Sequence, residues 1–247
     1  MGVELSMIKI AICDDESFLL EKNKEIAESA LKDLGCDYEI DAMSSGTELL
    51  DQYKSGRRYD ILLLDYQMDD LTGVETAAEI RKTDTEVIII FISSYITPAP
   101  KAFEVNAFRY VYRGADMKND LVKALTLAVH KIRFDSHEYE IKTRSKDYHI
   151  PTKEISYLES YKRKIIAHTS RGNIEFYKSI EDVESELKDW GFIRVHRSYI
   201  VNVNHIQHMG RKTIIVRSQN DIELPISKNK RDEIIHQKIE YHNGENL

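Results

Sequence analysis

Two short runs in the first half of the chain consist wholly of apolar residues, and they constrain the fold more than any other feature of the sequence. They are residues 61–64 (ILLL) and 87–92 (VIIIFI). A strand with one face in water alternates apolar and polar residues, whereas a continuous apolar run of this length is typical of a strand buried on both faces. Such strands occur in parallel sheets that helices cover on each side.

Helical and strand patterns alternate regularly around these two runs. We expect strands at residues 7–13, 38–43, 60–64, 87–92 and 108–112, and helices at residues 16–34, 44–55, 73–82, 98–106 and 116–134. Ser44 or Ser45 can cap the second helix, and Gly35 and Gly56 follow the first two helices at positions typical of C-caps. These strand–helix units in succession predict an α/β domain with a doubly wound, five-stranded parallel sheet.

From residue 137 the pattern changes to short β-rich runs. The expected strands are residues 139–143, 147–150, 155–158, 164–169, 173–177, 206–209 and 213–216, and helical patterns occur at residues 179–188 and 228–241. No long linker separates the halves, so we place a short hinge at residues 135–138. The sequence therefore predicts two domains, an α/β domain at residues 7–134 and a mostly-β domain at residues 139–243.

The sequence gives no signal for a membrane or for export. No apolar run approaches the ~20 residues that cross a bilayer, and residues 1–6 lack the basic and apolar regions of a signal peptide. We interpret residues 1–6 as a leader or an added remnant before the first domain. Cys13 and Cys36 are too few for a disulfide framework and have no metal-ligand spacing. These features favour the reducing cytoplasm and no membrane partner.

Charge is distributed unequally between the halves. Of the net charge of −7, residues 1–136 carry −9 and residues 137–247 carry +2. The second half also holds eight of the nine histidines. This asymmetry is compatible with a metal or phosphate site in the first half and a nucleic-acid reader in the second.

Polar and charged side chains follow four of the five expected parallel strands. They are Asp14, Asp15 and Glu16 after the first strand, Asp65 after the third, Ser93 and Ser94 after the fourth, and Arg113 after the fifth. The carboxyl ends of parallel strands meet at one edge of a sheet, where such folds bind ligands. Carboxylates and carbonyls are the ligands that Mg²⁺ prefers. A strand-end Asp beside that metal can attack a phosphoryl group, with a cation to offset the charge on its oxygens.

Several of these segments carry the motifs of a known family. They are Asp14-Asp15, residues 60–68 (DILLLDYQM) with Gly73 after them, residues 91–94 (FISS) and residues 102–110 (AFEVNAFRY). Residues 7–133 thereby resemble the receiver domain of two-component response regulators. The resemblance implies phosphorylation of Asp65 and a Mg²⁺ ion held by Asp14, Asp15, Asp65 and the Gln67 carbonyl. It also implies that Ser93 is the switch hydroxyl and Tyr110 the switch aromatic.

Two positions depart from the receiver pattern. The family usually has Lys-Pro after the fifth strand, and this chain has Arg113-Gly114. The Met-Pro step after the acceptor reads Met68-Asp69. Arg113 keeps the positive charge that bridges the phosphoryl group and the acids, but a planar guanidinium is not equivalent to an ammonium group. This departure motivates a second interpretation, in which the receiver only dimerises and is not phosphorylated.

The second half also carries a specific phrase, residues 192–202 (FIRVHRSYIVN). Flanking matches are residues 155–160 (ISYLES), 163–169 (RKIIAHT) and 224–228 (LPISK). Residues 139–241 thereby resemble the LytTR-type DNA-binding domain. The resemblance implies a β-sheet domain whose loops, rather than a recognition helix, enter successive major grooves of the duplex.

Three loops are the candidates for DNA contact: residues 161–164, 195–198 and 227–230. Arg can pair with both O6 and N7 of guanine, while Lys and Ser suit phosphates or single acceptors. We therefore expect Arg163, Arg197 and Lys228 to read bases, and Lys164, Ser198 and Lys230 to position the backbone. Three basic loops need only a local positive patch, so a net charge of +2 is compatible with DNA binding.

Plainer interpretations exist for each feature taken alone. Acids at residues 14–16 could simply complement a helix dipole, Asp65 could be a loop residue, and residues 161–164 could be a solvated hairpin turn. His205 and His208 lack metal partners at suitable spacing, and we interpret them as strand surface. A haloacid-dehalogenase-type phosphatase would need a second Asp where Gln67 stands, and its Asp would follow the first strand.

The combination favours a regulator rather than an enzyme. We expect a transcription factor that a sensor histidine kinase phosphorylates on Asp65, and that dimerises on repeated promoter DNA. A constitutive DNA-binding protein and a Mg²⁺-dependent phosphohydrolase with an accessory β domain are the alternatives. Unchanged DNA binding with a phosphodonor would identify the first alternative, and multiple-turnover phosphate release without DNA affinity would identify the second.

Overall fold

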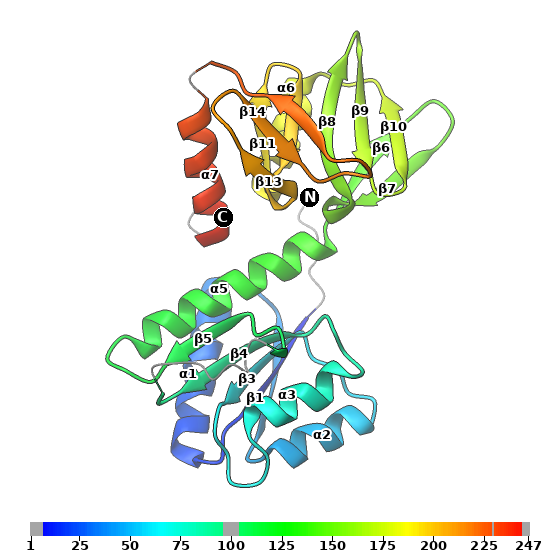
Figure 1. Ribbon diagram of the computed structural model, residues 1–247. Helices are drawn as coiled ribbons and strands as arrows, with labels where there is room; N and C mark the ends of the chain where they lie inside the picture. Colours follow the sequence, from blue (N-terminus) through cyan, green and yellow to red (C-terminus); the bar gives the residue numbers. More distant parts are fainter. Residues whose placement is uncertain (1–6, 96–103, 229, 244–247) are drawn as a thin grey trace. The chain divides into compact units, whose positions relative to one another are not determined.

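The computed structural model describes residues 7–95, 104–228 and 230–243 (Figure 1). The chain divides into two compact units, residues 1–129 and residues 130–247. Residues 1–6 and most of the expected helix at residues 98–106 lie outside the described residues.

The first unit alternates strands and helices as the sequence predicts. Its elements are β1 (Ile8–Cys13), α1 (Ser17–Asp33), β2 (Tyr38–Met43), α2 (Gly46–Lys54), β3 (Ile61–Asp65), α3 (Gly73–Arg81), β4 (Ile88–Ser93), β5 (Arg109–Tyr112) and the start of α5 (Met117–Ser136). The strands form one five-stranded sheet in the order β2-β1-β3-β4-β5, and every pair is parallel. The predicted doubly wound α/β fold is confirmed.

The apolar runs at residues 61–64 and 87–92 predicted strands buried on both faces, and β3 and β4 are buried in this way. Every residue of β3 and of β4 is buried, because α1 and α5 cover one face of the sheet while α2 and α3 cover the other (Figure 1). Side chains of α2 and α3 such as Leu49, Val74 and Ile80 pack with sheet residues in one core. The strand ends are thereby fixed on a rigid support, and the polar residues that follow them are held at one edge.

Local signals set the helix starts near this edge. The Ser45 side chain accepts a hydrogen bond from the Glu48 N–H and caps α2. Thr72 and Glu75 form a reciprocal capping box at the start of α3. Each cap satisfies backbone N–H groups that the first helical turn leaves free.

The second unit is built mainly from short antiparallel strands. Its strands are β6 (Glu138–Lys142), β7 (Asp147–Pro151), β8 (Ile155–Tyr161), β9 (Lys164–Thr169), β10 (Gly172–Phe176), β11 (Phe192–His196), β12 (Tyr199–Asn202), β13 (Ile206–Met209), β14 (Thr213–Val216) and β15 (Ile222–Pro225), and its helices are α6 (Ile180–Leu187) and α7 (Arg231–Asn243). They form a central sheet in the order β10-β9-β8-β12-β11, a three-stranded sheet β13-β14-β15 and the ribbon β6-β7. The predicted mostly-β fold is confirmed.

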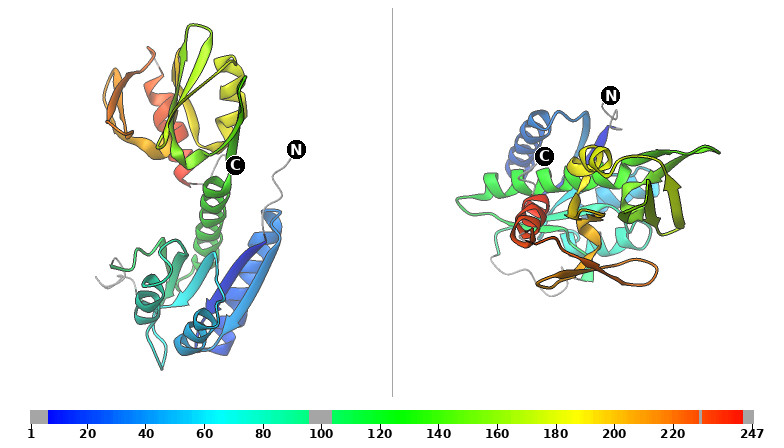
Figure 2. Two further views of the ribbon diagram at one scale, coloured as in Figure 1. Left: turned by 90° about the vertical axis from the view of Figure 1, so that its right-hand side faces the viewer. Right: turned by 90° about the horizontal axis from the view of Figure 1, so that it is seen from above.

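Two hydrophobic cores lie on opposite faces of the central sheet. One core joins the β6-β7 ribbon and α6 to the sheet, through residues such as Ile141, Val183 and Leu158. The other joins β13–β15 and α7 to it, through residues such as Ile214 and Ile234. Figure 2 shows α6 and the β13–β15 sheet on opposite sides of the central sheet. The central strands are therefore held from both sides, and their connecting turns are left at the ends of the sheet.

The structure differs from the expectation at several short elements. β11, β12 and β15, of four or five residues each, were not predicted as separate strands, although β13 and β14 of four residues each were. His205 lies in a 3₁₀ helix at residues 203–205 rather than on a strand, so that part of the interpretation is wrong. The Asn202 side chain starts this turn by accepting from the Asn204 N–H. His208 is an exposed residue of β13, as expected.

Candidate functional site

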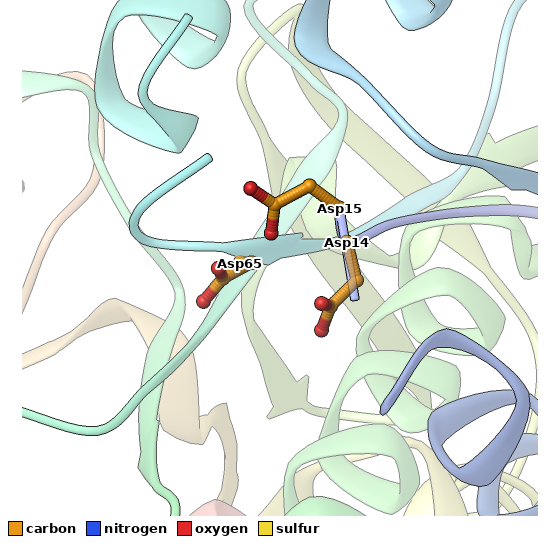
Figure 3. A group of neighbouring side chains, drawn as sticks. All are labelled: Asp14, Asp15 and Asp65. Carbon is orange, nitrogen blue, oxygen red and sulfur yellow. The ribbon is translucent and has the colours of Figure 1, made fainter. Parts of the chain in front are cut away.

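Three carboxylates meet at the carboxyl edge of the parallel sheet. Asp14 and Asp15 follow β1, Asp65 ends β3, and each offers an oxygen within 4.8 Å of those of the other two. Figure 3 shows the three side chains grouped where these strands end. Asp14 is 0% exposed and Asp65 is 8% exposed. The sequence-predicted acids therefore form one cluster, and the two inner carboxylates are largely removed from water.

Burial makes this cluster electrostatically unusual. Burial raises the pKa of Asp65 from its ordinary 3.8 to about 6; Arg113 opposes the shift and the Asp14 charge adds to it. Burial also raises the pKa of Asp14, again against the effect of Arg113. Two neighbouring buried carboxylates repel each other when both are ionised. A cation placed among them relieves this repulsion.

Arg113 is the cation within this structure that fills that position. Its Nη2 lies 2.5 Å from Asp14 Oδ2 and 3.0 Å from Asp65 Oδ1. The other oxygen of Asp14 accepts a hydrogen bond from the Glu16 N–H at 3.1 Å. Both oxygens of Asp14 thus have protein donors. Asp14 is suited to hold Arg113 in place, and Asp15 and Asp65 are more open to a metal ion.

The residues around the cluster line a pocket of about 620 Å³ at this edge. Its lining includes Asp15, Asp65, Gln67, Ser93 and Arg113, together with Thr72 and Tyr95. Ser93 is 1% exposed, and its hydroxyl accepts from the Tyr95 N–H at 3.1 Å. Sequence reasoning did not select Thr72 or Tyr95, although the Thr72–Glu75 capping signature marks the first of them.

Tyr110 lies apart from the acids. It does not line this pocket, and its hydroxyl donates to the Tyr95 carbonyl at 3.2 Å. Its ring packs near Tyr66, with ring centroids 6.0 Å apart. Tyr110 therefore contacts the segments that follow Asp65 and Ser93, rather than the carboxylates themselves.

Gly73 is required by the backbone next to Asp65. A Cβ atom at this position would lie well inside the 3.0 Å that real Cβ atoms keep from the Asp65 carbonyl oxygen. The Gly73 N–H also donates to the Tyr66 carbonyl at 3.1 Å. The loop after β3 thus folds back tightly on the strand end, and this approach fixes Asp65 at the mouth of the pocket.

The three loops selected in the second half lie together at one end of the central sheet. The Ser160 N–H donates to the Ser198 carbonyl at 2.8 Å, which joins the β8–β9 turn to the β11–β12 turn. The Ser227 N–H donates to the Val195 carbonyl at 2.9 Å, which joins the segment before α7 to the end of β11. The loops are distant in sequence, and the antiparallel sheet brings them together.

The basic side chains of these loops differ in how they are held. Arg163, Arg197 and Lys228 are exposed, and the described residues provide none of them with an acidic ion-pair partner. Lys164 Nζ lies 2.7 Å from Glu175, and Lys230 Nζ lies 3.4 Å from Glu233. The Ser198 N–H donates to His196 Nδ1 at 3.2 Å, which shapes the β11–β12 turn. The three side chains expected to read bases are thus exposed and without an acidic partner among the described residues.

Arg194, within the same phrase, has a supporting position. It forms ion pairs with Glu181 and Glu184 of α6 at 2.9 and 2.8 Å. Its Nη2 also donates to the Arg197 carbonyl at 3.0 Å. An arginine bound to two carboxylates and a carbonyl fixes the backbone of the turn that presents Arg197.

Within the described residues, no helix has the length and apolarity needed to span a membrane.

The fold and the acidic edge are those of a receiver domain, and the comparisons with known proteins agree. Residues 10–126 match the model of the response regulator receiver domain. Residues 145–238 match the model of the LytTr DNA-binding domain. The chain belongs to the response regulators of the LytTR family, which combine these two domains in transcriptional regulation.

Curated relatives match over most of their length. The chain is 27% identical to the transcriptional regulatory protein NatR of Bacillus subtilis, over 84% of this chain and 87% of NatR. It is also 27% identical to the accessory gene regulator protein A of Staphylococcus aureus, over 86% of this chain and 94% of that protein. A solved LytTr DNA-binding domain from Bacillus cereus is 24% identical, with a TM-score of 0.35, over 42% of this chain and 97% of that one.

Proposed function

We propose that this protein is a DNA-binding response regulator whose receiver is phosphorylated on Asp65 by a sensor histidine kinase. The observation that carries the proposal is the position of Asp65. Its carboxylate ends a buried strand, lies beside two further acids, and faces a pocket that also holds Ser93 and Arg113. Histidine-kinase phosphorylation would occur in the cytoplasm, where we place the protein.

The chemistry is transfer of a phosphoryl group between two side chains. A carboxylate oxygen of Asp65 attacks the phosphorus atom of a phosphohistidine, the P–N bond breaks, and an acyl phosphate forms while the imidazole takes up a proton. A carboxylate must be ionised to attack; burial raises the pKa of Asp65, and the Arg113 charge beside it opposes that shift and favours the ionised form. Ser93 is placed to bond a phosphoryl oxygen from the adjacent strand end.

The donor set fits Mg²⁺, because oxygens of three carboxylates lie within 4.8 Å of one another. Asp15 and Asp65 would hold the ion together with the Gln67 carbonyl, and Asp14 would act with them as a charge neighbour that also positions Arg113. When bound, the ion neutralises charge on the phosphoryl oxygens. Arg113 supplies a positive charge beside Asp65, where receivers usually have lysine.

Phosphorylation would act on DNA binding through dimerisation. Tyr110 bonds to the residue that follows Ser93 and Ser94, so a change at Ser93 can reach its ring through that segment. Two receivers that associate bring two DNA-binding domains to a repeated promoter site. The second contact then forms at a high effective concentration, so modest dimerisation produces a strong change in affinity.

The three loops of the second unit are the proposed DNA-reading surface. Arg163, Arg197 and Lys228 would contact base edges, and Lys164, Ser198 and Lys230 would contact the backbone. The hydrogen bonds that join the loops support a single surface, and the exposure of the three base-reading candidates leaves them free to bind.

One observation favours the constitutive alternative. Arg113 already bonds to Asp14 and Asp65 within this structure, so the charge of the site is balanced without a phosphoryl group. In that case the receiver would only dimerise, and a phosphodonor would leave DNA binding unchanged.

Phosphorylation is tested by mass. The full chain is incubated with Mg²⁺ and acetyl phosphate, and the intact mass is measured beside Asp65→Asn and the exposed-site control Asp51→Asn. The proposal predicts the gain of one phosphoryl group in the wild type and in Asp51→Asn, and none in Asp65→Asn. A wild-type chain that gains no mass would support the constitutive alternative, and multiple-turnover release of phosphate from small esters by a chain without DNA affinity would favour the hydrolase.

A further inference from the structure

A second basic surface lies on the LytTR domain outside the three loops. The β6–β7 turn exposes Arg144, Ser145 and Lys146, and no ion pair joins Arg144 or Lys146 to an acidic side chain among the described residues. Lys146 Nζ lies 4.3 Å from the centroid of the Tyr148 ring. The exposed Asp147 is the acid next to the turn in sequence. The turn thus presents two cations with no carboxylate bound to them.

Hydrogen bonds hold this turn in one shape. The Thr143 hydroxyl donates to the Lys146 carbonyl at 2.7 Å and accepts from the N–H groups of Ser145 and Lys146. The Thr143 N–H also donates to the Lys146 carbonyl at 3.2 Å. A cation on a fixed turn loses less conformational freedom on binding than one on a loose loop.

Tyr177 connects this turn to the proposed DNA-reading surface. This residue is 60% exposed and follows β10 directly, beside the end of β9 that starts at Lys164. The Arg144 guanidinium carbon lies 5.4 Å from the ring centroid, and Lys164 Nζ lies 5.7 Å from it. One exposed aromatic ring thus lies between a cation of the β6–β7 turn and a cation of the β8–β9 turn. Both turns and β10 can be followed in Figure 1.

We propose that Arg144, Lys146 and Tyr177 contact DNA phosphates that flank the base pairs read by the three loops. This inference rests on the proposed DNA-binding function. Unpaired cations and a tyrosine hydroxyl are the groups that bind duplex phosphates. The surface continues the loop that contains Arg163 and Lys164, so a duplex that meets this loop passes the β6–β7 turn as well. Its role is to add affinity and fix orientation without reading sequence.

Salt dependence provides the measurement. Each phosphate contact adds about 0.9 to the slope of log affinity against log salt concentration. The double variant Arg144→Gln/Lys146→Gln should therefore have a slope shallower by about 1 to 2. At 0.1 M salt its affinity should fall on the order of tenfold or more, while its preference among DNA sequences stays unchanged. Binding is followed by fluorescence anisotropy, with a duplex that the full-length protein selects from a random pool.

The matched control is Arg171→Gln. Arg171 is an exposed arginine at the opposite end of the β9–β10 hairpin, where it pairs with Glu154 at 2.5 Å. It should leave the slope unchanged, which separates a local contact from a general effect of charge. On duplexes shortened stepwise from either end, the difference between the wild type and the double variant should disappear once the flanking phosphates are removed. Circular dichroism melting confirms that each variant is folded.

The outcomes separate the two proposals. If the wild type binds no selected duplex, or if Arg163→Gln and Arg197→Gln bind as well as the wild type, the proposed DNA-reading surface is wrong. If those variants lose affinity and the double variant keeps the wild-type slope on every duplex, the flanking contact is wrong. An equal loss in Arg171→Gln would also overturn it, because the effect would then come from net charge alone.

Discussion

The buried carboxylate of Asp65 opposes folding, and its replacement by asparagine should stabilise the receiver domain. Asp65 is 8% exposed, and its pKa rises from 3.8 to about 6 on folding, mainly because of burial. Each unit of pKa change corresponds to about 1.4 kcal/mol. Ionised Asp65 therefore costs on the order of 3 kcal/mol at neutral pH. Asparagine has nearly the same shape and no charge to bury.

The sign of the pH dependence follows from the raised pKa. A carboxyl group with a higher pKa in the folded state favours folding when it is protonated, and this advantage disappears as the pH rises through about 6. The stability of Asp65→Asn relative to the wild type should therefore increase with pH. Roughly half of the full difference should be present at pH 5 and nearly all of it at pH 8.

Hydrogen–deuterium exchange can read this difference in the receiver alone. Peptides that span β3 and β4 report the opening free energy of their own unit in a two-domain chain. The measurement is made with EDTA, so that metal binding does not contribute, and the exposed-site variant Asp51→Asn serves as the control. Two results would contradict an unfavourable buried charge at Asp65. One is protection in Asp65→Asn at pH 8 that is equal to or lower than that of the wild type. The other is a difference between the two proteins that does not change between pH 5 and pH 8.

Three further predictions follow from individual contacts. Gly73→Ala should lower the free energy of unfolding by about 1–3 kcal/mol and suppress phosphorylation, because its Cβ would collide with the Asp65 carbonyl; urea denaturation and intact mass test the two effects. Asn202→Ala should cost about 1–3 kcal/mol in a urea titration, because the fully buried Asn202 amide donates to the carbonyls of Thr152 and Ile155. Arg113→Gln should show a larger rise in melting temperature with Mg²⁺ than the wild type, because Asp14 and Asp65 lose the cation that now pairs with both; an equal rise would argue against that role.

The fold of the first unit was predictable largely because strands buried on both faces consist of continuous apolar residues. The apolar runs before Asp65 and Ser93 identified strands buried on both faces, and the acids could then be grouped by the geometry of parallel sheets. The three DNA loops were selected by resemblance and basic residues. Their proximity could not be derived, because it depends on antiparallel register and on hydrogen bonds such as that from Ser227 to Val195.

Features that depend on tertiary contacts were not predictable. Strands of four residues carry only a weak periodic signal, so that β13 and β14 were predicted while β12 and β15 were not. The bond from the Glu16 N–H to Asp14 depends on the path of the chain after β1. Likewise, no pattern along the sequence places Arg144 beside Tyr177, because the two belong to different hairpins that meet only in the folded domain.

The most direct test of the account asks whether the state of Asp65 controls dimerisation and DNA binding together. Sedimentation of the full chain is measured with Mg²⁺, with and without beryllofluoride, in the presence of the selected duplex and with Asp65→Ala as the control. The account predicts a dimer and tighter DNA binding only with beryllofluoride, and neither change in Asp65→Ala. The same oligomer and the same DNA affinity in every condition would contradict a phosphorylation switch and leave a constitutive regulator.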